Sequence, residues 1–243
     1  MPKRSLSAAA STDSTEPMTV VCFGDSNTHG QSSDAEVRMA LADRWTTHLQ
    51  RTVHDNFTII CEGLNGRTTV HDDPIDSVFA GIGGVNLNGR RYLLPCLHSH
   101  KPVHTVVLGL GANDLKARFN LSAADIRRGL RTLLSDIKQS GAGPDGGAPT
   151  IVVLSPPKCK DTATNAEWGF SGCASKSVET IKLYREECAA QGLPFVDLSE
   201  VASVGKDGVH FTAAAAIPIA EAVAMALMSL YKNKWRAPAD DLT

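Results

Sequence analysis

The chain has 243 residues, of which 42% are hydrophobic, so it is long enough for one large domain with an ordinary buried core. Its 24 Lys and Arg against 26 Asp and Glu leave a formal charge of −2, which argues against a dedicated nucleic-acid-binding protein. No run approaches the roughly 18 consecutive apolar residues of a membrane helix, so no membrane partner is expected.

Residues 1–17 are rich in Ser, Thr and Ala, and we expect them to form a disordered N-terminal arm. They lack the apolar stretch of a secretory signal. The six cysteines form no CxxC pair, and a chain of this size does not need disulfides, so free thiols and a cytoplasmic location are favoured. One domain is expected at 18–235, followed by a C-terminal tail at 236–243.

Short β-rich runs alternate with helical patterns along this domain. The runs expected to be strands are 19–23, 57–61, 103–108, 150–154 and 194–196, and the patterns expected to be helices are 36–52, 123–139, 176–191 and 213–231. Most of the strand runs are apolar throughout, which is typical of parallel strands covered by helices. The alternation predicts an α/β protein, a three-layer α/β/α sandwich with a parallel five-stranded sheet. Its functional loops should follow the strands, including a long insertion at 158–172 that is expected to shape a pocket.

A serine, Ser26, directly follows the first expected strand. A serine hydroxyl is a poor nucleophile until a base takes its proton, so the chain must also supply a histidine and a group that orients it. His210 and Asp207, three residues apart before the last helix, have the spacing to do both. The alternative interpretation is an ordinary turn that leads into a helix capped by Thr212.

Two further loops carry groups that suit acyl transfer, which needs N–H donors for the oxyanion. Gly66 lies in the loop after the second expected strand, where a glycine lets backbone N–H groups approach a ligand. Asn113 follows the third expected strand, and its side-chain amide is placed to point at the same region. All these groups are expected on one rim of the sheet.

These four blocks together resemble the SGNH (GDSL-type) hydrolases, which have a flavodoxin-like fold and whose signature residues lie in blocks of this kind and order. The resemblance implies that Ser26 is the nucleophile and that His210 is the base, oriented by Asp207. It also implies an oxyanion hole formed by the backbone N–H groups of Ser26 and Gly66 and the amide of Asn113.

The stretches CFGDSNTHG, EGLNGRTTVHDDP, LNGRRYLLPCLHSH, LGLGANDLK and DGVHFT are similar to the bacterial arylesterase and acyltransferase branch of that family. This likeness implies a homo-oligomer that acts on small carboxylic esters and transfers acyl groups to alcohols. The chain departs from the branch at 31–37 and 158–177, and His29 and Gln31 stand where the branch carries tryptophans. We therefore expect a serine esterase for short-chain aryl or alkyl esters, with no cofactor and with acyl transfer secondary.

The alternative is a catalytically silent SGNH or flavodoxin-like domain that binds a small ligand or a partner. A binding module does not need a nucleophile, a base, an orienting acid and oxyanion donors at compatible positions, so this alternative is disfavoured. A dinucleotide site is also disfavoured, because the pair Gly109 and Gly111 lacks the third glycine of that motif.

Other polar residues near the blocks have simpler interpretations. No carboxylate or cysteine pattern accompanies His98, His100 and His104 in the sequence, so no metal site is expected. Two acids beside the signature residues, Asp25 and Asp114, should hydrogen-bond the rim loops. Two neighbouring cations are expected to neutralise these acids, namely Arg67 and Lys116.

Overall fold

The computed structural model describes residues 16–35, 37–79 and 86–235. The expected tail at 236–243 lies outside the described residues, as does all but the last two positions of the expected arm at 1–17. Five parallel strands form one sheet in the order β2-β1-β3-β4-β5. They are β1 (Met18–Gly24), β2 (Phe57–Gly63), β3 (Thr105–Gly109), β4 (Thr150–Leu154) and β5 (Phe195–Val196).

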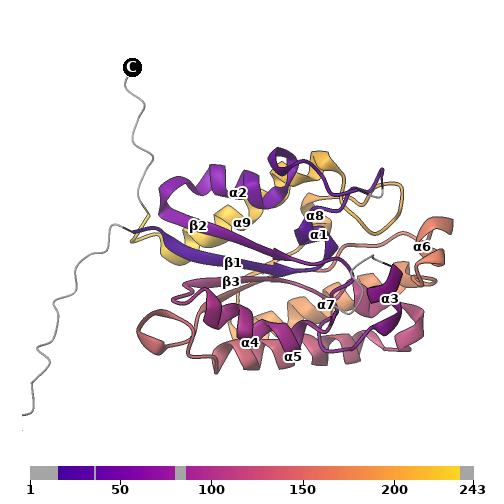
Figure 1. Cartoon of the computed structure of the whole chain (residues 1–243), viewed down its shortest axis with the longest axis horizontal. Helices are drawn as coiled ribbons and strands as arrows, with labels where there is room; N and C mark the ends of the chain where they lie inside the picture. Colours follow the sequence, from indigo (N-terminus) through magenta and orange to yellow (C-terminus); the bar gives the residue numbers. More distant parts are fainter. Residues whose placement is uncertain (1–15, 36, 80–85, 236–243) are drawn as a thin grey trace, which may run out of the picture.

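Helices cover both faces of the sheet, and Figure 1 shows α2 and α9 on one side with α4, α5 and α7 on the other. The described helices are α1 (Ser26–His29), α2 (Trp45–Val53), α3 (Pro74–Phe79), α4 (Gly89–Ser99), α5 (Ala123–Lys138), α6 (Ala163–Glu167), α7 (Cys173–Gln191), α8 (Leu198–Val201) and α9 (Ala216–Tyr231). The predicted three-layer α/β/α sandwich with a parallel five-stranded sheet is therefore confirmed.

Alternation along β1 explains why both layers form, since successive side chains of a strand point to opposite faces. Val20 and Cys22 pack into the core under α2 and α9, whereas Val21 and Phe23 pack into the core under α4, α5 and α7. All four are fully buried. The strand order changes direction between β1 and β3, and in open parallel sheets ligands bind at such a switch point, outside the carboxyl ends of the strands.

The expected helix at 36–52 is wrong over its first half. Helix α2 begins only at Trp45, and a bridge between Gln31 and Arg38 and a 3-10 turn precede it. The apolar residues that suggested a helix face do not reach the core, because Val37 is 60% exposed and Leu41 is 66% exposed. This segment instead forms a loop beside the end of β1.

Five of the described helices were not anticipated, namely α1, α3, α4, α6 and α8. Helix α4 contains Pro95, which masks its pattern, and it starts where the Asn88 side chain accepts a hydrogen bond from the Arg90 N–H. Helix α6 interrupts the insertion at 158–172, so that insertion is not wholly irregular. At the last helix, a 3-10 turn at Ala213–Ala215 precedes α9, so the expected helix at 213–231 begins with a separate turn.

The stretch Ala213–Tyr231 has a mean hydropathy of 1.8 over its most apolar window and is long enough, by length and composition, to cross a membrane. In this fold it lies against the sheet and α2. Ile219, Val223 and Leu227 of α9 are fully buried there. One apolar face of α9 is thus part of the core.

Candidate active site

Ser26 is the first residue of α1, directly after β1. The Asp25 side chain caps this short helix by accepting a hydrogen bond of 2.9 Å from the Asn27 N–H. Gly30 ends the helix in a left-handed conformation with φ 87°. The sharp passage from strand to helix holds Ser26 at the carboxyl end of the sheet, at the switch point between β1 and β3.

His210 and Asp207 complete a relay with Ser26. His210 Nε2 lies 2.8 Å from Ser26 Oγ, and His210 Nδ1 lies 2.7 Å from Asp207 Oδ2. The second carboxylate oxygen of Asp207 accepts the backbone N–H groups of Val209 and His210, each at 2.8 Å. Burial opposes ionisation of Asp207, but the hydrogen bonds and charge of His210 lower the pKa of this carboxyl below its ordinary value. A charged Asp207 fixes the tautomer in which Nδ1 donates to it and Nε2 accepts from Ser26.

Asn27 holds the loop that carries His210, a contact that sequence reasoning missed. Its Nδ2 donates to the carbonyl of Val209 at 3.3 Å, and its Oδ1 accepts the N–H of Phe211 at 3.1 Å. The indole N–H of Trp45 donates to the Asn27 carbonyl at 3.1 Å. The side-chain amide of Asn27 thus hydrogen-bonds the residues that precede and follow His210 in the sequence.

Three groups offer N–H donors beside Ser26. Gly66 has φ 78°, and a Cβ there would lie 2.8 Å from Leu87 Cδ1, so both conformation and space favour glycine. Asn113 Nδ2 donates to the Arg67 carbonyl at 3.1 Å, which orients the amide and leaves its second N–H for another acceptor. Within the described part of the chain, the backbone N–H groups of Ser26 and Gly66 have no protein acceptor.

A cavity of about 740 Å³ joins these groups. Ser26, Gly66, Asn113 and His210 all line it. The 158–172 insertion contributes Trp168, whose ring centroid lies 5.9 Å from that of His210, so the expectation that this insertion shapes a pocket is confirmed. Much of the remaining wall is polar, and includes Ser32, Asp34, Asp76, Lys116, Arg118 and Glu167.

The acids beside the signature residues are buried and hydrogen-bonded, as expected. Burial raises the pKa of Asp25 to about 6, against opposing contributions from the Asn27 N–H and the charge of His210. Burial likewise raises the pKa of Asp114, whose carboxylate accepts the N–H and hydroxyl of Thr69. Asp114 thereby ties the loop after β3 to the loop after β2.

The expectation that Arg67 and Lys116 neutralise these acids holds only in part: the charge of Arg67 lowers the pKa of Asp25, but among the described residues neither cation forms an ion pair with Asp25 or Asp114. The Arg67 guanidinium donates to the carbonyls of Gly24 and Glu62, at the ends of β1 and β2, and lies 4.3 Å from the Phe23 ring centroid. Lys116 is 2% exposed and pairs with Asp76. Each cation has thus found acceptors at the end of a strand or on α3, because Asp25 and Asp114 are already satisfied by loop N–H groups and a hydroxyl.

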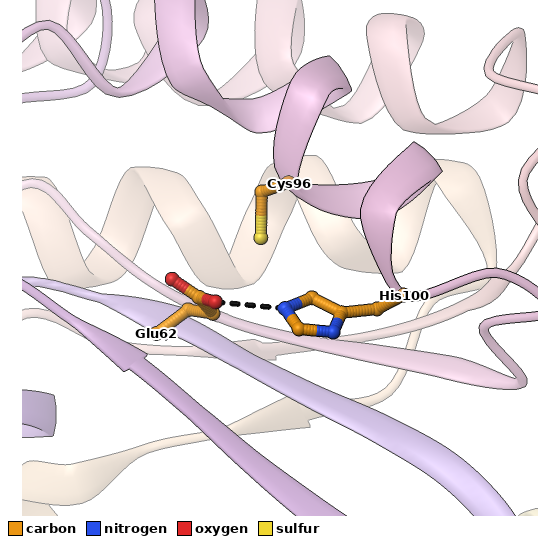
Figure 2. Close-up of side chains that lie close together, drawn as sticks. All are labelled: Glu62, Cys96 and His100. Carbon is orange, nitrogen blue, oxygen red and sulfur yellow. Dashed lines mark hydrogen bonds and ion pairs between the residues drawn. The ribbon is translucent and has the colours of Figure 1, made fainter.

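Two of the three histidines are a surface and a partly buried imidazole, as expected, and only His100 differs. His98 is exposed, and His104 Nδ1 accepts the Thr19 N–H at 3.0 Å. His100, however, lies beside a carboxylate and a thiol, those of Glu62 and Cys96, as Figure 2 shows. This grouping escaped notice because Glu62 comes from β2 and because α4, which places the other two one turn apart, was not anticipated.

A flavodoxin-like strand order with a Ser-His-Asp relay at its switch point defines an SGNH-type hydrolase fold and site. The chain belongs to the GDSL-like lipase/acylhydrolase family, whose model matches residues 22–216. The resemblance drawn from the four blocks is therefore confirmed. A comparison with curated protein sequences finds no match.

Solved structures give the same result. A carbohydrate acetylesterase family member from Sinorhizobium meliloti is 31% identical with a TM-score of 0.80, and the match covers 88% of this chain and 99% of that one. The aryl esterase of M. smegmatis is 34% identical with a TM-score of 0.78, over 88% and 99% of the two chains. A putative arylesterase from Agrobacterium tumefaciens is 29% identical with a TM-score of 0.75, over 87% and 99%. These relatives agree with the arylesterase branch.

Proposed function

We propose that this protein is a serine esterase that hydrolyses short-chain carboxylic esters through an acyl-enzyme. The observation that carries the proposal is the continuous relay from Ser26 Oγ through His210 to Asp207, with distances of 2.8 and 2.7 Å, at the wall of an open cavity. A hydrogen-bonded nucleophile, base and orienting acid is the arrangement that activates a serine.

The geometry supports the following steps. Ser26 Oγ attacks the ester carbonyl while its proton passes to His210 Nε2, and the charge of Asp207 stabilises the imidazolium that forms. The oxyanion is stabilised by the N–H groups of Ser26 and Gly66 and by the free N–H of Asn113. His210 then protonates the leaving alcohol, which departs and leaves Ser26 acylated. Water, deprotonated by His210, releases the acid and restores Ser26.

The cavity wall supports hydrolysis as the dominant outcome. Acyl transfer to an alcohol requires that water be kept from the acyl-enzyme. Here ionic side chains, including Asp76, Lys116 and Arg118, line the cavity together with Ser26 and hold water near it. We therefore propose that transfer to alcohols is detectable but secondary. The printed names of the solved relatives, an aryl esterase and a carbohydrate acetylesterase, support small esters as substrates.

The test is a panel of p-nitrophenyl esters from acetate to decanoate. We expect the wild type to prefer the shortest chains and Ser26→Ala to lose about 10⁴-fold or more in kcat while keeping its circular dichroism spectrum. Ser32→Ala, which removes another hydroxyl from the same cavity, is the matched control and should stay active. A folded Ser26→Ala protein that keeps a tenth of the wild-type rate would contradict the proposal.

A further inference from the structure

Three side chains of metal-ligating type converge between β2 and α4, away from the cavity of Ser26. Glu62 lies near the end of β2. Cys96 lies in the last turn of α4, and His100, one turn later, caps the helix by donating its N–H to the Cys96 carbonyl at 3.2 Å. Figure 2 shows the thiol of Cys96 directed between the carboxylate and the imidazole. The ligand atoms of the three residues all lie within 4.8 Å of one another, and Glu62 Oε1 is 2.8 Å from His100 Nε2.

The cluster has one buried ligand and one side that is accessible to solvent. Cys96 is 1% exposed, whereas the side chains of His100 and Glu62 are 28% and 19% exposed. A cation can therefore enter from solvent and still meet a thiol within the core. None of the three residues lines the cavity that holds Ser26, so the cluster is a separate place in the fold.

The chemistry of this set is selective. Thiolate, imidazole and carboxylate together suit Zn²⁺, which prefers sulfur and nitrogen ligands in tetrahedral sites, whereas Mg²⁺ and Ca²⁺ prefer oxygen alone. The two anionic ligands balance the double charge of the ion, which lowers the cost of half-burying it. We propose that Glu62, Cys96 and His100 form a zinc-binding site, with water on the open side as the fourth ligand.

Without the ion, the same groups form a hydrogen-bonded cluster. The Tyr92 hydroxyl donates to Glu62 Oε2 at 3.3 Å. Burial, reinforced by the charge of Glu62, raises the pKa of the Cys96 thiol to about 12, so the metal-free thiol is neutral. When zinc binds, the Cys96 thiol releases its proton to solvent and the sulfur forms the Zn–S bond. Tyr92 can keep its hydrogen bond and orient the ligating carboxylate from outside.

The positive charge of Arg67 opposes the binding of Zn²⁺ at this site. The Arg67 guanidinium lies 5.4 Å from the Tyr92 ring centroid and interacts electrostatically with both Glu62 and Cys96. Its repulsion means that the site depends on both anionic ligands, and removal of either charge should abolish tight binding. Glu62→Gln is therefore expected to fail as a zinc ligand even though its shape is preserved.

The test is a titration of the full, tag-free chain with Co²⁺ as a spectroscopic probe and with Zn²⁺ in calorimetry. We expect one ion per chain and a sulfur-to-cobalt charge-transfer band, and we expect zinc to displace the cobalt. Cys96→Ser should remove the band and weaken zinc binding by at least about 100-fold, the upper end of the loss that even outer-shell changes cause. Cys188→Ser, which alters another buried free thiol, is the matched control.

A second pair of variants tests the site independently, in case the Cys96→Ser protein does not fold. His100→Asn should weaken zinc binding, whereas His98→Asn, on the exposed side of the same helix, should not. A wild-type chain that binds no ion, or one whose bound cobalt shows no sulfur charge transfer, would overturn the proposal. Equal affinity in the wild type and Cys96→Ser would do the same. None of these outcomes depends on esterase activity, so the two proposals fail separately.

Discussion

Replacing Asp25 by asparagine should make the protein more stable at neutral pH. Asp25 is 3% exposed, and burial raises the pKa of its carboxyl from the ordinary 3.8 to about 6. An asparagine keeps the shape and the oxygen that caps the Asn27 N–H, but it never ionises. The substitution thus removes the cost of holding a charge in the core and leaves the local hydrogen bond in place.

The magnitude follows from the two pKa values. A carboxyl whose pKa is raised in the folded state binds more protons there, so its contribution to stability is full below pH 3.8 and is lost as the pH rises through about 6. The loss is about 2 kcal/mol at pH 5 and about 3 kcal/mol at pH 7. Asp25→Asn should therefore gain about 1 kcal/mol more over the wild type at pH 7 than at pH 5.

Urea denaturation of both proteins at pH 5 and pH 7 measures this difference. The control Asp55→Asn removes an exposed carboxylate, and its stability relative to wild type should differ little between the two pH values. A gap between Asp25→Asn and wild type that is equal at both pH values would refute the reasoning. We also expect kcat to fall at pH 7, because the negative charge that favours a protonated His210 is gone.

Four further outcomes are expected. Asn113→Ala should lower kcat by about 10² to 10³ with little change in KM, because its amide meets the oxyanion only as charge develops; an effect on KM alone would contradict that role. Asn27→Ala should lower kcat by about 10 to 100-fold, because His210 is no longer held in place. Asn27→Asp keeps only the acceptor for the Phe211 N–H, so its kcat should lie between those of Asn27→Ala and the wild type. Equal kcat in all three proteins would show that Asn27 does not position His210. Light scattering should give a multiple of the chain mass of 25.8 kDa, and a particle of single-chain mass would contradict a homo-oligomer. Vinyl acetate with benzyl alcohol should give benzyl acetate as a minor product, and acetate as the sole product would contradict acyl transfer.

The sheet was predictable from the sequence because its signals are local. Each strand carries a short apolar run, and burial on both faces explains the lack of polar alternation in β1, β3 and β4, whereas β2 at the sheet edge is only partly buried. The loop before α2 was not predictable, because Val37 and Leu41 are apolar yet exposed and so imitate the face of a helix. Helix α4 was hidden by Pro95, because a proline inside a helix lacks the backbone N–H donor and usually marks a break in the helical pattern.

The relay was predictable because the chemistry restricts which residue types serve together. Ser26, His210 and Asp207 were expected to meet, and the structure places them within hydrogen-bonding distance. Partners reached only through tertiary packing were not predictable. Nothing in the sequence indicates that Arg67 would find the carbonyls of Gly24 and Glu62 rather than a carboxylate, since backbone acceptors carry no residue-specific signal.

Three consecutive residues explain how the site can be held firm while its surroundings vary. The Asp25 N–H donates to the Gly109 carbonyl at the end of β3, Ser26 contacts His210, and the amide of Asn27 holds the loop around that histidine. The nucleophile is therefore fixed from the sheet. The cavity walls also contribute, because the Gln31 N–H donates to the Ser26 carbonyl, and the Lys160 N–H and the Thr162 hydroxyl donate to the carbonyls of Gly208 and Asp207. Changes in those walls that leave these hydrogen bonds in place should alter which ester binds, and so KM, more than the rate at which the bound ester reacts.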